Sequence, residues 1–247
     1  MFARIAEAYR RTRKPNDLLW NRFVARPLAA VVLVPLQRTS VTPNQVTLAT
    51  LIVFAGAAAI LAFVPAWRGL LVGAAVLEFA YVLDCVDGQL ARLRGTSSPI
   101  GAHLDFLMDE LKAFLLVAAL SVRLWRSDGK TAWLLEGLVA LVAVASAISL
   151  TTFLRRPEYA AATGASVGHG RGDYGDGFAP DAAPRSLSPK RAVEALGSFL
   201  SHYPSYFVFV ALANRVDLFM HVYLAINAAH VARSLLGITL KLGRRTS

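Results

Sequence analysis

The chain has 247 residues, of which 55% are hydrophobic and only 17% are charged, and its mean hydropathy is +0.49. Soluble domains usually carry about 25% charged residues, so this composition excludes an ordinary soluble domain and predicts an integral membrane protein. The formal net charge of +10 does not indicate a nucleic-acid partner, because the basic residues gather in particular segments between apolar runs.

The first 44 residues precede the strongest apolar segments and carry several arginines. Within them, residues 17–37 alternate apolar side chains with arginines, and Pro27 and Pro35 interrupt any long helix. This pattern favours an amphipathic helix lying in the membrane interface over a seventh buried span. We therefore expect residues 1–44 to form a cytoplasmic and interfacial segment.

Six apolar segments follow, and each is long enough, or nearly so, to cross a bilayer, for which a helix needs about 20 residues. They are rich in Ala, Leu and Val, a composition typical of membrane helices that pack closely. The sequence predicts an all-α membrane domain over residues 45–240 and a basic tail over 241–247. The predicted transmembrane helices are 45–64, 70–91, 103–124, 132–153, 193–213 and 217–238.

The linker over residues 155–190 is rich in Gly, Ala, Pro and charged side chains. This composition is typical of a flexible loop. A glycine-rich phosphate cradle is disfavoured, because it requires a preceding strand and a following helix.

The distribution of basic residues predicts the orientation. With the N-terminus in the cytoplasm, most of the 26 arginines and lysines fall in the cytoplasmic segments 1–44, 92–102, 154–192 and 239–247. By the positive-inside rule, this predicts a multi-pass protein of the plasma (inner) membrane with both termini in the cytoplasm.

Four aspartates lie at the cytoplasmic ends of the second and third predicted spans. Asp84 and Asp87 are three residues apart and Asp105 and Asp109 are four apart, so each pair shares one helix face. Carboxylates in or beside a membrane are costly and mark functional sites. Because like charges repel and hard oxygen ligands favour Mg²⁺, Mn²⁺ or Ca²⁺ over zinc, we expect a divalent-metal site, with two Mg²⁺ or Mn²⁺ ions.

The neighbours of these aspartates complete the pattern D-x2-D-G-x2-A-R-x8-G-x3-D-x3-D over residues 84–109. It resembles the signature of the CDP-alcohol phosphotransferase (CDP-alcohol phosphatidyltransferase) family, and residues 42–47 (TPNQVT) resemble that family's usual start of the first span. The resemblance implies an enzyme that moves a substituted phosphate from a CDP-alcohol to an acceptor hydroxyl and releases CMP. It also implies a homodimer and, with CDP-diacylglycerol as the expected donor, a part in phospholipid biosynthesis.

The resemblance further implies a role for each matching residue. Asp84, Asp87 and Asp105 would be metal ligands, and Asp109 would be a ligand or the base that takes the acceptor's proton. The CDP part would lie against Gly88, Ala91, Arg92, Gly101 and Asn44.

Candidates for binding the acceptor or a lipid phosphate lie outside the signature. They are Arg155, Arg156, Arg191, His230 and Arg233. Each kind of residue also has an alternative role. The arginines can serve as positive-inside anchors, and the polar stripe of the sixth span can form hydrogen bonds between helices.

The donor and the acceptor also stay open. Residues 14–27 loosely resemble the start of the di-inositol-phosphate-phosphate synthases, which use a soluble CDP-alcohol. Glu110 departs from the inositol-phosphate branches, which usually have arginine at this position. A rival from another class is a cation or proton-coupled transporter, but a transport pathway predicts carboxylates across the membrane depth, whereas these gather at one face.

Overall fold

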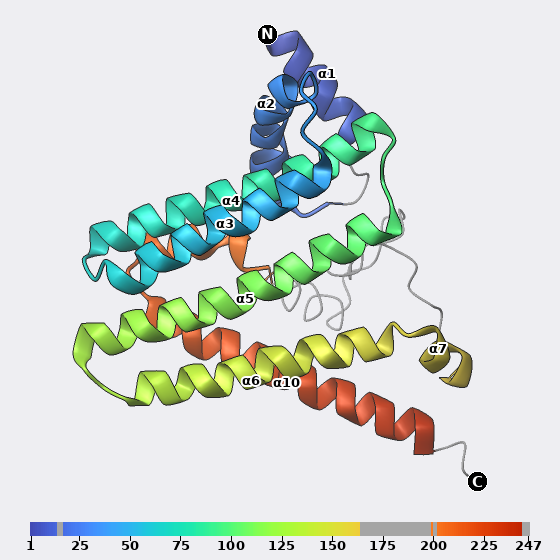
Figure 1. The fold of residues 1–247 in the computed structure, drawn as a ribbon. Coiled ribbons are helices and arrows are strands. Elements are labelled where there is room, and N and C mark those ends of the chain that lie inside the picture. Colours follow the sequence, from blue (N-terminus) through green and yellow to red (C-terminus); the bar gives the residue numbers. More distant parts are fainter. Residues whose placement is uncertain (14–16, 164–198, 200–201, 244–247) are drawn as a thin grey trace, which may run out of the picture.

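The computed structural model describes residues 1–13, 17–163, 199 and 202–243, which are helical wherever they form regular structure and contain no strand (Figure 1). The elements are α1 (Phe2–Thr12), η1 (Asn21–Ala25), α2 (Arg26–Leu36), α3 (Pro43–Phe63), α4 (Trp67–Arg94), α5 (Pro99–Asp128), α6 (Ala132–Leu154), α7 (Pro157–Thr163), η2 (Tyr203–Ser205), α9 (Phe207–Leu212) and α10 (Val216–Gly243).

Four of the described helices, α3, α4, α6 and α10, are long and apolar enough to cross a membrane. They match the first, second, fourth and sixth predicted spans, and their length and composition indicate a membrane protein. The third predicted span lies within α5, a 30-residue helix whose first half carries several charged side chains. The fifth, 193–213, lies partly outside the described residues, and its described part forms η2 and α9.

Two predicted segments differ from the structure at their ends. Residues 157–163 of the predicted flexible loop form α7, and the rest of that loop lies outside the described residues. The predicted basic tail begins inside α10, which continues to Gly243. The second difference arises because helical hydrogen bonding continues beyond the apolar segment that a hydropathy pattern detects. The first arises because α7 is a separate short helix, which starts at Pro157 after α6 has ended at Leu154.

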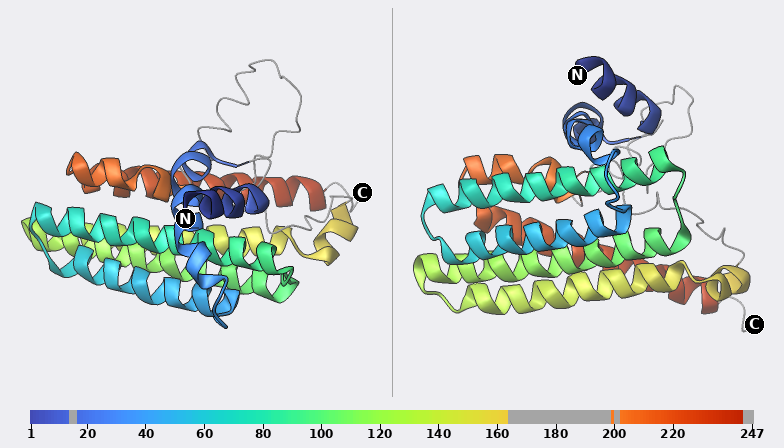
Figure 2. Two further views of the ribbon diagram at one scale, coloured as in Figure 1. Left: turned by 90° about the horizontal axis from the view of Figure 1, so that it is seen from above. Right: turned by 45° about the horizontal axis from the view of Figure 1, so that its top comes forward.

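The long helices α3 to α6 alternate in direction along the chain; α3 packs against both α4 and α5, α6 packs against α5, and α10 packs against α6 (Figures 1 and 2). Small residues permit close packing at two crossings. A Cβ atom at Gly73 of α4 would lie 2.6 Å from the Leu61 side chain, and one at Gly137 of α6 would lie 2.1 Å from Ser121 Oγ. The alternation in direction brings the end of α4 to the start of α5.

Local capping sets the helix ends around this junction. Thr42 and Gln45 form a reciprocal capping box at the start of α3, with the two side chains accepting backbone hydrogen bonds at 3.3 and 2.9 Å. Gly95 ends α4 in the left-handed region, at φ 65°, where glycine avoids a steric penalty. Ser98 Oγ then accepts from the Gly101 amide at 3.1 Å and starts α5.

The N-terminal segment is helical but contains several elements. The single helix expected over residues 17–37 is instead a π-helical turn, η1, followed directly by α2, with Pro27 in the first turn of α2. Ala29 and Leu33 are fully buried in a cluster with side chains of α4. This packing holds the segment against the side of α4 that faces away from α5 (Figure 1).

Arg123 closes the opposite end of the bundle. Its buried guanidinium donates four hydrogen bonds of 2.8–3.1 Å to backbone carbonyls at the end of α3 and in the α3–α4 turn. The acceptors are Leu61, Val64, Pro65 and Ala66. Carbonyl groups at a helix end lack hydrogen-bond partners within the helix. Arg123 of α5 therefore supplies the donors for the carbonyl groups of the turn between α3 and α4.

We predict that Arg123→Met destabilises the protein by about 2–4 kcal/mol, because it removes charged hydrogen bonds and leaves buried carbonyls without donors. The measurement is thermal or denaturant unfolding in detergent, followed by circular dichroism. Arg126→Met is the matched control, since Arg126 is exposed and lies over the Phe63 ring. Equal stability of the two variants would contradict this account.

Candidate functional site

Three of the four signature aspartates converge where α4 ends and α5 begins. Carboxylate oxygens of Asp84, Asp105 and Asp109 all lie within 4.8 Å of one another. Asp84 comes from α4 and the other two from α5, and α3 packs against both helices, so the cluster forms where the end of α4 and the start of α5 come together beside α3. Asp84 has 17% of its side chain exposed and Asp109 has 48%, so the cluster is open on the Asp109 side.

Asp87 lies beside this cluster but makes a different contact. It is buried, and its Oδ2 accepts a hydrogen bond from Thr47 Oγ1 of α3 at 2.5 Å. It is close enough to Asp84 and Asp105 to interact with them electrostatically. This hydrogen bond connects Asp87 to α3. The role of Asp87 as a metal ligand stays a prediction.

Lys112 enters the cluster from α5, one turn after Asp109. Its Nζ donates to Asp109 Oδ1 at 2.9 Å and to Asp84 Oδ1 in a short ion pair. Only 5% of the Lys112 side chain is exposed. Sequence reasoning gives this lysine no contact with the aspartates, although its spacing of three residues from Asp109 is the signal that places both on one helix face.

Asn44 and Gly101, two residues expected near the CDP part, meet where α3 and α5 begin. A Cβ atom at Gly101 would lie 3.4 Å from Asn44 Oδ1 and 3.2 Å from the capping Ser98 Oγ. The first turn of α3 and the first turn of α5 therefore lie close together at this point.

The remaining residues of that group lie on the last turns of α4. Gly88 is half-buried and Ala91 is buried. Arg92 Nε donates to the carbonyl of Thr12 at 3.1 Å, which ties the end of α1 to the signature. Sequence reasoning does not predict this contact, since Thr12 and Arg92 are 80 residues apart.

The candidates for acceptor binding divide into two groups. The Arg155 guanidinium lies over the Phe106 ring, 5.4 Å from its centroid, next to Asp105 in sequence. Arg156 and Glu110 line a hollow between α6 and α5. These arginines therefore lie close to the first half of α5, and their role in binding the acceptor stays a prediction.

The second group lies on α10 and at the start of the predicted fifth span. His230 Nε2 lies 3.1 Å from Thr151 Oγ1 of α6, so His230 forms a hydrogen bond between helices, which is the alternative role of the polar stripe. Arg233 is on the same helix, one turn later. Arg191 lies outside the described residues.

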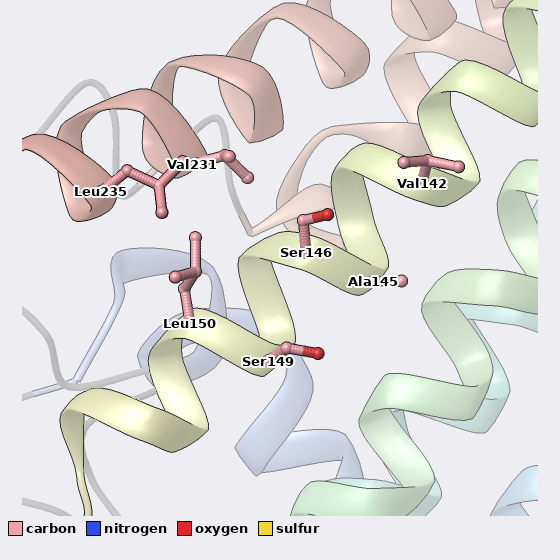
Figure 3. A pocket seen from close by; sticks show the side chains of 7 residues that line it. All are labelled: Val142, Ala145, Ser146, Ser149, Leu150, Val231 and Leu235. Carbon is pink, nitrogen blue, oxygen red and sulfur yellow. The ribbon is translucent and has the colours of Figure 1, made fainter.

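An apolar hollow continues from the hollow at Arg156 along α6. Figure 3 shows its lining side chains, which come from α6 and α10. They are Val142, Ala145, Ser146, Ser149, Leu150, Val231 and Leu235. Ser149 lines both hollows, so a surface of small and apolar residues joins a mouth that carries Arg156 and Glu110.

A buried polar network joins the N-terminal segment to α4 one turn before Asp84. Asp17 pairs with Arg26 and accepts from Asn21 at 3.0 Å, and Tyr81 donates to Asn21 at 2.5 Å. The Tyr81 hydroxyl also lies 2.8 Å from His202 Nε2. Sequence reasoning misses this network, because its members come from separate stretches of the chain and follow no periodicity.

Comparison with known proteins gives two kinds of match. A family model described as CDP-alcohol phosphatidyltransferase matches residues 40–171, which include the whole signature. The chain is also similar to the phosphatidylinositol phosphate synthase of Corynebacterium glutamicum, with 34% identity over 133 residues, 53% of this chain and 55% of the relative.

Two further relatives match over shorter stretches of the chain. The archaetidylinositol phosphate synthase of Aeropyrum pernix is 37% identical over 102 residues, 40% of this chain and 50% of the relative. The bifunctional IPC transferase and DIPP synthase of Aquifex aeolicus is 32% identical over 103 residues, 42% of this chain and 23% of the relative. The matches thus span about half, or less, of the length of these relatives.

We predict that Thr47→Val lowers the free energy of unfolding by about 1–3 kcal/mol, because it removes the donor from the buried Asp87 carboxyl. The measurement is denaturant unfolding in mixed micelles. Thr50→Val is the matched control, since buried Thr50 donates to the Val46 carbonyl of its own helix. An equally large loss of unfolding free energy in Thr50→Val would show that the hydrogen bond to Asp87 does not cause the effect of Thr47→Val.

Proposed function

Because the chain belongs to the CDP-alcohol phosphatidyltransferase family, we propose that it transfers a substituted phosphate from a CDP-alcohol to the hydroxyl of an acceptor alcohol, with release of CMP. The observation that carries this proposal is the convergence of Asp84, Asp105 and Asp109 at one end of α4 and α5. A transport pathway instead requires carboxylates at successive depths, and the signature carboxylates gather at one depth.

The donor atoms of the cluster fit a hard divalent cation. Several carboxylate oxygens within a few ångströms of each other suit Mg²⁺ or Mn²⁺, which prefer oxygen ligands. Asp84, Asp105 and Asp109 would hold the ion, with Asp87 beside them as a ligand for a second. Such ions, when bound, neutralise charge on the transferring phosphate and on the leaving CMP.

Asp109 is the residue we propose as the base. Nearly half of its side chain is exposed, so an acceptor hydroxyl can reach it, and a carboxylate within hydrogen-bond reach can take the hydroxyl proton. Gly88, Ala91 and Arg92 on α4, and Asn44 with Gly101 at the α3–α5 contact, would border the CDP part. The Arg92 guanidinium would supply a forked donor to a phosphate.

We propose a lipid donor, CDP-diacylglycerol, and hence a part in phospholipid biosynthesis. The apolar hollow of Figure 3 and the hollow at Arg156 share Ser149, so an apolar surface adjoins a basic side chain, which suits a molecule with an apolar tail and an anionic head. A soluble CDP-alcohol is the second candidate, which the resemblance of residues 14–27 to the di-inositol-phosphate-phosphate synthases implies, and the name of the Aquifex aeolicus relative includes a DIPP synthase.

For the acceptor, we propose an alcohol that carries a phosphate. The names of two relatives state inositol phosphate lipids as their products. Arg155, which lies over the Phe106 ring, and Arg156 would bind such a phosphate, and the acidic Glu110, which shares a hollow with Arg156, would limit which acceptors bind. His230 and Arg233 lie on α10, which packs against α6, and are weaker candidates for binding the acceptor.

The same proposal includes the topology. The predicted third and fifth spans would complete six transmembrane helices, with residues 1–44 in the interface and the site and both termini on the cytoplasmic side of the plasma membrane. Exposed apolar side chains on the N-terminal segment, including Leu19, Phe23 and Leu28, support contact with lipid. Assembly as a homodimer rests on the family resemblance.

The deciding experiment supplies the purified protein with Mg²⁺ or Mn²⁺ and pairs of donor and acceptor, and measures CMP release. The donors are CDP-diacylglycerol and CDP-inositol, and the acceptors include inositol phosphate, inositol and glycerol phosphate. We predict release that requires the metal and that falls by about a hundredfold or more in Asp109→Asn.

Asp128→Asn is the matched control, since Asp128 lies at the other end of α5 and pairs with exposed Lys130. Release from CDP-inositol alone would replace the lipid donor with the soluble one. No release from any pair, or unchanged release in Asp109→Asn, would exclude the proposed reaction or the proposed base.

A further inference from the structure

Lys112 holds a position that a bound cation would also favour. Its ammonium is buried and donates to one carboxylate oxygen on each side, Asp84 Oδ1 and Asp109 Oδ1. These two oxygens belong to the residues that form the candidate metal cluster with Asp105. The lysine therefore neutralises part of the charge that would otherwise attract a divalent ion.

An ion and the ammonium cannot both use these oxygens without conflict. A divalent cation bound to Asp84 and Asp109 would lie a few ångströms from Nζ, where like charges repel strongly at the low dielectric of a half-buried site. Lys112 is also held in place, because breaking one partner of a buried ion pair leaves an uncompensated charge. Metal binding must therefore displace the ammonium from at least one carboxylate or overcome the repulsion between the ammonium and the divalent cation.

We propose that Lys112 is a positioning residue that acts as an internal counter-ion of the aspartate cluster and competes with divalent metal for Asp84 and Asp109. Its ion pairs hold Asp84 and Asp109 together, and its charge makes metal binding weaker than the carboxylates alone would allow. This inference rests on the proposed metal-dependent function and assigns to one residue the control of metal affinity.

The test measures Mn²⁺ binding to the purified full chain by the electron paramagnetic resonance signal of free Mn²⁺. Lys112→Met removes the charge and keeps the apolar stem, whereas Lys112→Arg keeps the charge. We expect Lys112→Met to bind Mn²⁺ about tenfold more tightly, a modest change in binding free energy, or to bind one more ion. Lys112→Arg should stay close to the wild-type protein.

Lys130→Met is the matched control, since Lys130 is an exposed lysine in the turn between α5 and α6 and pairs only with Asp128 among the described residues. It should not change Mn²⁺ binding. A merely structural role for Lys112 would weaken binding in every Lys112 variant, including Lys112→Arg, and would not produce a gain in affinity.

Removal of the lysine can also unfold the metal-free protein, so Lys112→Met and Lys112→Gln are purified with and without Mn²⁺. Folding that depends on Mn²⁺ supports the inference, because the metal then replaces the ammonium. Loss of the fold under both conditions, or binding equal to or weaker than that of the wild-type protein, overturns it.

Asp84→Ala separates this inference from the proposed function. If Asp84→Ala loses Mn²⁺ binding while Lys112→Met binds as the wild-type protein does, the metal site stands and only the role of Lys112 is wrong. If the wild-type protein binds no Mn²⁺, or Asp84→Ala binds it equally well, the proposed metal site fails and the inference fails with it.

Discussion

Mutual repulsion among four carboxylates at one end of two helices is the constraint on which the rest of the structure depends. One carboxylate oxygen from each of Asp84, Asp105 and Asp109 lies within 4.8 Å of the other two, and Asp87 lies beside them in a buried position. Partly buried like charges at this distance disfavour one another's ionised form, unless hydrogen bonds or cations offset them. Thr47 of α3 supplies a hydrogen bond, and Lys112 of α5 supplies a cation.

The surrounding architecture holds the carboxylates at this distance. Caps at Thr42, Gly95 and Ser98 set where α3, α4 and α5 begin or end, so the aspartates fall at one level. At the far end, Arg123 ties the α3–α4 turn to α5 through four hydrogen bonds. Because the same three helices are fixed at both ends, their facing side chains have little freedom to separate.

Hydropathy and spacing predict much of this arrangement. Four predicted spans lie close to α3, α4, α6 and α10, since a long apolar run is a local property that the sequence displays directly. The aspartate cluster is also predicted, because spacings of three and four residues determine a helix face without further information. The split of the N-terminal helix into η1 and α2 is not, because a π-helical turn before Pro27 leaves no mark in the hydropathy pattern.

By itself, the sequence determined the membrane character, the helix faces that carry the aspartates, and the family signature, since each depends on composition or on spacing along one stretch of chain. Only the tertiary structure decided which partner each charge meets. Lys112 bridges α5 to α4, Asp87 turns to α3, Arg92 reaches the end of α1, and His230 joins α6. These contacts join residues that are distant in sequence, and packing of the helices, rather than any local pattern, brings them within hydrogen-bond distance.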